Sequence, residues 1–284
     1  MKQTIALNNK KYELVQIQRA GISAIYKNGD EYLRIGDSNK IKKDLESHRK
    51  MEESGFPVAR ILKEGDLKGM HYFIESSLGE QKIGAIFAHD MLHLGSISDV
   101  HFDIFLSVVE KFAKAQLNTQ TNNKDFDIFA SGIYLETLCE ELPHYADKIR
   151  TLFSDIKKRL SVFPFVLTHG DFNPSNMYPL GIIDFEDSFY GPFGYDIVGS
   201  LVHIDYFPHS QKYEYFGKYR FTEEQKQKYK ALIDSISEQA SLPKLSQFEK
   251  DFEFCRATWL LVRMGEWPKL QKFRYNLFTE RFLK

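Results

Sequence analysis

Two polar loops follow apolar, strand-like runs between Val166 and Asp196. The first run reads VLTHGDFNPSN and carries His169, Asp171 and Asn176, and the second reads GIIDFE and carries Asp184. Polar residues that leave the end of a rigid strand are typical of an active site carried on loops. The rest of the chain is therefore expected to position these two loops.

Transfer of a phosphoryl group to a hydroxyl requires a carboxylate that orients or deprotonates the hydroxyl. It also requires oxygen ligands that hold magnesium against the nucleotide phosphates. The pattern His169-x-Asp171-x4-Asn176, followed by Asp184, supplies both kinds of group. We interpret Asp171 as the catalytic base or hydroxyl-orienting group, and Asn176 and Asp184 as the metal ligands, because this spacing matches kinase catalytic-loop and metal-binding motifs.

The same segment resembles the aminoglycoside phosphotransferase and choline kinase superfamily, the small-molecule branch of the protein-kinase-like fold. In that family the loop reads HGDxxxxN, and the metal motif reads I-D-F/W-E/G, as residues 183–186 do here. The sequence Gly194-Tyr195-Asp196-Ile197 resembles the family's downstream Asp motif. The resemblance spans most of the chain, but its specific motifs lie between Leu167 and Asp196.

The resemblance implies an α+β, bilobal fold. A small antiparallel-sheet lobe that binds the nucleotide is expected over residues 1–77. A mainly helical lobe with the catalytic loop and the acceptor site is expected over residues 78–284. The predicted helices of this second lobe cover 101–117, 133–142, 145–160, 222–240 and 248–264, and the fourth opens with the capping box Thr222-x-x-Gln225.

The implied reaction is ATP- and magnesium-dependent transfer of the γ-phosphoryl group to a hydroxyl of a small molecule, in the cleft between the lobes. Aminoglycosides, choline-like compounds, amino sugars and related metabolites are all open as acceptors, and GTP is possible as the donor. The C-terminal segments hold no dense acidic cluster that would favour a polycation. The alternatives are a protein kinase-like enzyme and a catalytically silent nucleotide-binding protein, although intact Asp171, Asn176 and Asp184 disfavour the silent protein.

In the N-terminal lobe, a strand over 12–18, a Gly/Ser turn and a strand over 24–27 lead to an Asn28-Gly29 hairpin and a returning strand over 31–35. The resemblance implies that Gly21 and Ser23 belong to the nucleotide-positioning loop. Arg34 stands where the family usually has a phosphate-contacting lysine. Arginine keeps the charge but differs in shape and reach. The alternative for Arg34 is a solvated strand residue.

A helix over 39–54 is predicted next, and the resemblance implies that its Glu46 forms an ion pair with Arg34. Strands over 57–62 and 70–75 follow, around a turn at 65–69. The resemblance then implies a hinge at which the carbonyl of Glu75 and the N–H of Ser77 hold the adenine, with Ile74 guarding the pocket.

Three further side chains have an expected role. His169 is expected to position neighbouring backbone, and Asp196 is expected to be a partly buried brace that accepts N–H bonds from the loop. Trp267, next to Glu266, can stack on a cationic ligand, but ordinary helix packing is the alternative we favour.

Composition limits the other functions. The chain has 284 residues, 43% hydrophobic and 27% charged, with a formal net charge of -1. No bulk charge favours nucleic acid or a membrane, and no obligate protein partner is evident. The start lacks the apolar core of a signal peptide, and no run approaches a membrane-spanning length. Cys139 and Cys255 form no spaced cluster, which fits a reducing, cytoplasmic location.

Overall fold

The computed structural model describes residues 3–17, 22–263 and 267–284. The contacts within the chain divide it into two compact units. The first contains residues 1–81 and 178–183, and the second contains residues 82–177 and 184–284. The lobe boundary after residue 77 stays a prediction, and the division by contacts falls four residues later and adds 178–183 to the first unit.

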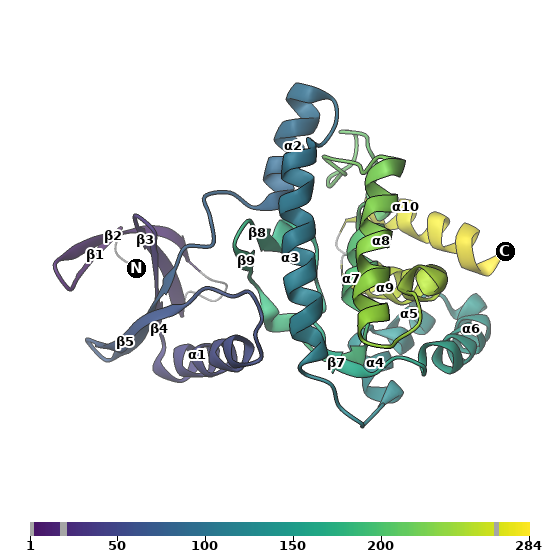
Figure 1. Cartoon of the computed structure of the whole chain (residues 1–284), viewed down its shortest axis with the longest axis horizontal. Helices are drawn as coiled ribbons and strands as arrows, with labels where there is room; N and C mark the ends of the chain where they lie inside the picture. The colour runs from purple at the N-terminus through teal and green to yellow at the C-terminus, as the bar shows by residue number, and fades with distance from the viewer. Residues whose placement is uncertain (1–2, 18–21, 264–266) are drawn as a thin grey trace. The chain divides into compact units, whose positions relative to one another are not determined.

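The first unit is built on one antiparallel sheet, whose strand order is β1-β2-β3-β4-β6-β5. One helix, α1 (Ser38–Glu53), packs against β4 and β6. The strands, shown with α1 in Figure 1, are β1 (Thr4–Leu7), β2 (Lys10–Ile17), β3 (Ser23–Asn28), β4 (Glu31–Gly36), β5 (Ile61–Leu67) and β6 (Met70–Ser76).

Alternation along β4 places Arg34 on the face of the sheet that α1 covers. Leu33 and Ile35 belong to an apolar cluster on one face, which also contains Tyr12 and Tyr26. Successive side chains of a strand point to opposite faces, so Arg34 faces the other way. There its guanidinium lies 6.0 Å from the Phe73 ring, which is part of the α1 side of the core.

The Asn28-Gly29 hairpin is confirmed. Asn28 pairs with Glu31, and Gly29 has a φ of 54°, which glycine adopts without steric cost. The strand predicted over 57–62 is wrong. The observed strand, β5, begins at Ile61 and runs to Leu67, before a tight turn at Lys68 and Gly69. This strand is polar and largely exposed at the edge of the sheet, so it has little apolar pattern for sequence reasoning to detect.

The second unit is mainly helical. The capping box at Thr222 and Gln225 is confirmed. The helix predicted over 133–142 is confirmed and begins two residues late, at Leu135, because Tyr134 adopts a φ of 60°. The helix over 126–132 was not predicted. The helices, most of them labelled in Figure 1, are α2 (Ile83–Leu94), α3 (Asp99–Leu117), α4 (Phe126–Gly132), α5 (Leu135–Glu141), α6 (Ala146–Leu160), α7 (Tyr195–Val202), α8 (Glu223–Gln239), α9 (Glu249–Arg263) and α10 (Pro268–Phe278).

Helix α3 packs against α2 and α8 through a cluster of aromatic rings. Phe87 of α2, Phe105 of α3 and Tyr229 of α8 are all fully buried. The ring of Phe105 lies 5.5 Å from that of Phe87 and 5.6 Å from that of Tyr229. Large aromatic side chains bury much apolar surface, so this cluster gives the unit a rigid centre.

Short elements carry the two loops. Strands β7 (Phe165–Leu167) and β10 (Tyr190–Pro192) form one antiparallel pair, and β8 (Met177–Tyr178) and β9 (Gly181–Ile182) form another. Only four residues separate Asn176 from Gly181, so the second pair is short, with two residues in each strand. The 3₁₀ turns η3 (Pro174–Asn176), η4 (Phe185–Asp187) and η5 (His203–Tyr206) also belong to this region.

Within the described ranges, no helix is both long enough and apolar enough to cross a membrane. Both cysteines are buried and free.

Candidate active site

The pairing of β7 with β10 brings the two polar loops together. Leu167 lies opposite Tyr190, and the Thr168 N–H donates to the carbonyl of Phe189 over 2.8 Å. Gly170 has a φ of +80°, and a Cβ there would lie 2.1 Å from the carbonyl oxygen of Asp187. Only glycine fits this contact, so the loop that holds Asp171 lies directly against the turn that follows Asp184.

Asp196 braces the first loop, as predicted. Its carboxylate is 2% exposed and accepts the backbone N–H groups of His169 (2.7 Å) and Gly170 (3.1 Å). Gln116 of α3 adds a third donor at 2.8 Å. His169 acts on the backbone too, because its Nδ1 accepts the N–H of Asp171 over 3.3 Å. Both side chains therefore fix the course of the loop.

Asp171 is held by side chains on both carboxylate oxygens. Arg256 Nη2 donates to Oδ1 over 2.6 Å, and Asn173 Nδ2 donates to the same oxygen over 2.9 Å. Asn176 Nδ2 donates to Oδ2 over 3.1 Å. The side chain of Asp171 is still 27% exposed. The carboxylate is thus fixed in orientation and remains open to a further hydrogen-bond donor.

Burial acts to raise the pKa of Asp171, but the Arg256 guanidinium and its neighbours outweigh burial, so the pKa lies below its ordinary value. A carboxylate with a lowered pKa stays ionised near neutral pH and is a weak proton acceptor. In phosphoryl transfer through a loose transition state, orientation of the hydroxyl contributes more than early proton removal. Asp171 is therefore suited to orienting a hydroxyl group.

Arg256 and His203 were not found from the sequence. Arg256 lies on α9 and is 1% exposed, and its Nη1 donates to the carbonyl of Gly170 over 2.6 Å. Its Nη2 also contacts Nδ1 of His203 over 2.9 Å. A charged residue among the apolar neighbours FCRATWLL was the one available signal, since a buried charge requires a partner.

Each of the two predicted metal ligands has a side-chain oxygen atom that can bind a cation. Asn176 uses its Nδ2 on Asp171, at the backbone carbonyl (3.0 Å) and at Oδ2, which leaves its own carbonyl oxygen as an acceptor. Asp184 is exposed and has a φ of 74°, a strained value for a residue with a side chain. Among the described residues, no three His, Cys, Asp or Glu side chains form a metal-binding group. Amide and carboxylate oxygens that complete their shell with phosphate and water suit magnesium.

The structure corrects the predicted Arg34–Glu46 ion pair. Arg34 Nε donates to Oε1 of Glu75 over 2.6 Å, and the carboxylate of Glu75 is also 3.8 Å from Nδ1 of His48. Glu46 instead pairs with Lys50 on the solvent side of α1, where its side chain is 69% exposed. The charge that faces Arg34 therefore comes from strand β6 and not from the helix.

The predicted hinge contact through Ser77 is also corrected. The Ser77 N–H donates to the carbonyl of Asp30 over 2.7 Å, because the β4–β6 ladder continues one residue beyond the strand. The adenine contact through the Glu75 carbonyl stays a prediction. Ser23 is buried at the start of β3 against Gly36, and its phosphate contact stays a prediction. Gly21 lies outside the described residues.

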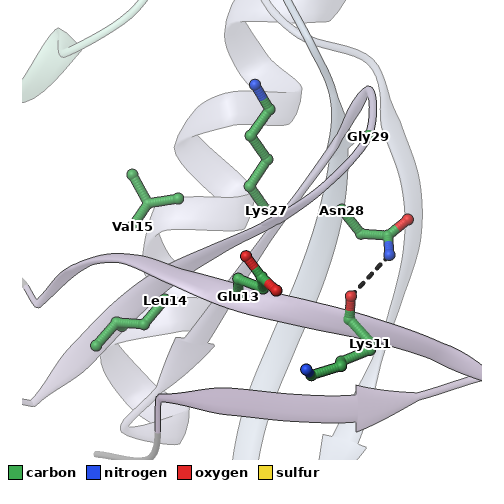
Figure 2. Close-up of a pocket in the computed structure, with 7 residues that line it drawn as sticks. All are labelled: Lys11, Glu13, Leu14, Val15, Lys27, Asn28 and Gly29. Carbon is green, nitrogen blue, oxygen red and sulfur yellow. Dashed lines mark hydrogen bonds between the residues drawn. The ribbon is translucent and has the colours of Figure 1, made fainter.

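The first unit contains a hollow of about 380 Å³ on strands β2 and β3. Figure 2 shows its lining, in which Asn28 Nδ2 donates to the carbonyl of Lys11 over 2.7 Å. Neither Ser23 nor Arg34 lines this hollow. It therefore gives no support to the predicted nucleotide contacts.

The fold and the paired loops define a kinase-like phosphotransferase. The model of the phosphotransferase enzyme family matches residues 29–232, which is more than half of the chain. The protein belongs to that family, and the resemblance inferred from the HGDxxxxN and IDFE motifs is confirmed. Among curated proteins, no sequence matches the chain significantly.

One solved structure, with a TM-score above 0.5, shows the same fold. A choline/ethanolamine kinase family protein from Mesorhizobium loti is 14% identical, with a TM-score of 0.55 over 94% of this chain and 87% of that one. The aminoglycoside phosphotransferase APH(3'')-Id from Streptomyces rimosus, solved with ADP and streptomycin, is 10% identical. Its TM-score is 0.49, over 87% of this chain and 92% of that one. The predicted bilobal α+β fold is confirmed.

The Arg34–Glu75 pair generates a stability prediction. Glu75→Gln removes the charge that faces the partly buried Arg34 guanidinium, so we expect the free energy of unfolding to fall by about 1–3 kcal/mol. Glu46→Gln is the matched control, and because its pair with Lys50 is exposed to solvent, it should leave the free energy of unfolding almost unchanged. Chemical denaturation measures both. A larger loss for Glu46→Gln than for Glu75→Gln would contradict the observed pairing.

Proposed function

We propose that the protein transfers the γ-phosphoryl group of ATP, bound with magnesium, to a hydroxyl group of a small molecule. The observation that carries the proposal is Asp171, which is ionised, fixed on both oxygens and still accessible. Membership of the phosphotransferase enzyme family supports the reaction class. A similar structure was solved with ADP, which suggests the nucleotide.

Each proposed role follows from the chemistry of the residue. Asp171 accepts a hydrogen bond from the acceptor's hydroxyl and aims its oxygen at the phosphorus atom. Asn176 and Asp184 hold the magnesium ion, which neutralises charge on the phosphate oxygens. Arg34 contacts the nucleotide phosphates, and Glu75 takes the bracing role that was predicted for Glu46. Gly21 and Ser23 remain proposed nucleotide neighbours on the resemblance alone.

We place the reaction in the cytoplasm, where ATP is available. The two free, buried cysteines are consistent with a reducing compartment. The direct test of the reaction is a screen of hydroxylated small molecules with γ-labelled ATP, in which label must appear on an organic product. Labelled phosphate alone, from hydrolysis of ATP, would contradict the proposal.

The role of Asp171 predicts a large kinetic effect. Asp171→Asn retains the shape but removes the charge, so turnover of the best acceptor from the screen should fall by about 10²–10⁴-fold. ATP affinity, measured by calorimetry, should change little. Asp155→Asn, on the exposed face of α6, is the control and should keep full activity. Turnover of Asp171→Asn near the wild-type value would remove Asp171 from the proposed role.

The role of Asp184 predicts a magnesium-specific effect. Asp184→Asn should weaken ATP binding in magnesium by about ten- to a hundredfold, the range found when groups of a metal site are removed. ATP binding in EDTA should be unchanged. Glu186→Gln alters a neighbouring exposed carboxylate of the same motif and is the matched control. Equal losses with magnesium and with EDTA would argue against metal ligation by Asp184.

A further inference from the structure

The second unit contains a cavity of about 620 Å³, a volume typical of small-molecule sites. The first turn of α2 forms one side, and Ser175 of the catalytic loop contributes to the lining. Turn η5 and the segment that follows it form the rest. The lining residues used below are Lys82, His203, Phe207, Glu214, Tyr215 and Lys218.

The cavity adjoins the catalytic carboxylate. His203 Nδ1 and Asp171 Oδ1 contact the same guanidinium nitrogen of Arg256, over 2.9 Å and 2.6 Å. The cavity wall and the carboxylate therefore lie within two hydrogen-bond lengths of each other. A ligand in this cavity is close enough for one of its hydroxyl groups to reach Asp171.

His203 presents a hydrogen-bond donor to the cavity. A guanidinium only donates, so Nδ1 of His203 must be the unprotonated nitrogen and Nε2 carries the hydrogen. Burial and the charge of Arg256 lower the pKa of His203 to about 3, so the ring stays neutral. The side chain is 9% exposed, and its Nε2 makes no hydrogen bond to a described residue. This N–H is therefore available to a ligand.

A second buried cation, besides Arg256, lies close to the cavity. Behind the wall lies Arg274, fully buried, whose guanidinium is 4.4 Å from the Phe207 ring. Arg274 donates to the backbone carbonyls of Tyr206 and Leu260, and no carboxylate of a described residue pairs with it. A buried charge without a counter-charge creates a strong field in low-dielectric surroundings.

The charged side chains among the described lining residues are mainly cations. Lys82 and Lys218 form no ion pair with a described residue. Among the described residues of the lining, Glu214 is the one with an acidic side chain, and it lies 3.9 Å from Lys269. Helix α2 also begins beside the cavity without a side-chain cap. The described lining therefore carries two cations without an ion-pair partner and one paired carboxylate, besides neutral imidazole and hydroxyl groups.

Aromatic rings form the apolar part of the wall. Tyr215 is 45% exposed, and the ring of Trp267 stacks on it at 5.4 Å and 19°. Phe207 lies 5.3 Å from Tyr215. Trp267 is thus a packing partner of the wall, in line with the helix-packing alternative. Rigid aromatic faces of this kind suit a flat or apolar part of a ligand.

We propose that this cavity binds the acceptor and that the acceptor is an anion. It would be a hydroxylated small molecule with a carboxylate or phosphate group, which His203, Lys82 and Lys218 recognise, and with an apolar face that lies on Tyr215 and Phe207. This inference rests on the proposed function and narrows its acceptor class. It disfavours polycationic acceptors, which the same field repels.

Four probes that share a benzyl alcohol and differ in charge test the proposal. They are 4-(hydroxymethyl)benzoate, 4-(hydroxymethyl)phenyl phosphate, the neutral 4-(hydroxymethyl)benzamide and the cationic 4-(hydroxymethyl)benzylamine. Binding to the full chain is measured by ligand-observed NMR titration. At least one anionic probe should bind about tenfold more tightly than the benzylamine, as expected for one charge-assisted hydrogen bond. The ratio between the two anionic probes distinguishes carboxylate from phosphate recognition.

Variants of the lining residues test whether the preference for anionic probes comes from this cavity. Lys82→Met and Lys218→Met should each weaken the anionic probe several-fold, and Lys82→Glu/Lys218→Glu should reverse the charge preference. His203→Asn offers Arg256 an acceptor at the position of Nδ1, but its shorter side chain has no donor at the position of Nε2, so it too should weaken the anionic probe. Lys212→Met changes an exposed lysine outside the lining and should have no effect.

Three outcomes would overturn the proposal. In the first, the benzylamine or streptomycin binds more tightly than the anionic probes. In the second, the affinity does not depend on the charge of the probe. In the third, neither anionic probe shows saturable binding at millimolar concentration. A different result would contradict the proposed function and leave the anion site intact. A protein that binds the anionic probe with the predicted variant effects but never transfers label from γ-labelled ATP keeps the anion site and loses the phosphotransferase role.

Discussion

The guanidinium of Arg256 is fully buried, and groups from two other parts of the second unit surround it. It donates to the carbonyl of Gly170 and the carboxylate of Asp171 in the loop, and it contacts His203 in η5. Its other face lies 4.4 Å from the Trp259 ring of its own helix. A buried charge is tolerated only when its partners are well placed, so the loop, η5 and α9 fix one another's positions.

This arrangement separates the roles of two aspartates in one short segment. Asp171 faces a cation, stays partly exposed and is ionised. Asp196 is buried and accepts N–H groups from the backbone on which Asp171 is carried. The first carboxylate is thus free to meet a hydroxyl group, while the second determines where the first one points. Arg256, which fixes Asp171, also contacts His203 in the cavity wall, so the proposed acceptor site and the proposed catalytic carboxylate share one buried cation.

The site residues that lie close together in the sequence were predicted correctly as a group. The contacts between distant segments of the chain were not predicted. The three candidate site residues, Asp171, Asn176 and Asp184, lie in one short stretch, so the sequence alone indicated that they belong to one site. Arg256 lies 85 residues from Asp171, and no local pattern connects the two. The predicted ion pair between Glu46 and Arg34 was wrong for a geometric reason. Ile41, Leu45 and His48 follow helical spacing on the inner face of α1, and one residue past Leu45 the helix has turned Glu46 toward solvent. The sequence did not indicate Glu75 as a charge partner because Glu75 lies within the largely buried strand β6, one residue before its end.

A double-mutant cycle on transfer rate tests most directly whether Arg256 acts through Asp171. Arg256→Lys keeps the charge but loses the fork of donors, and the cycle compares Arg256→Lys, Asp171→Asn and the double variant with the best acceptor. If Arg256 works by holding Asp171, Arg256→Lys slows transfer in the wild-type background and adds no further loss to Asp171→Asn. Losses that multiply in the double variant, or an Arg256→Lys enzyme with the full wild-type rate, would contradict the account.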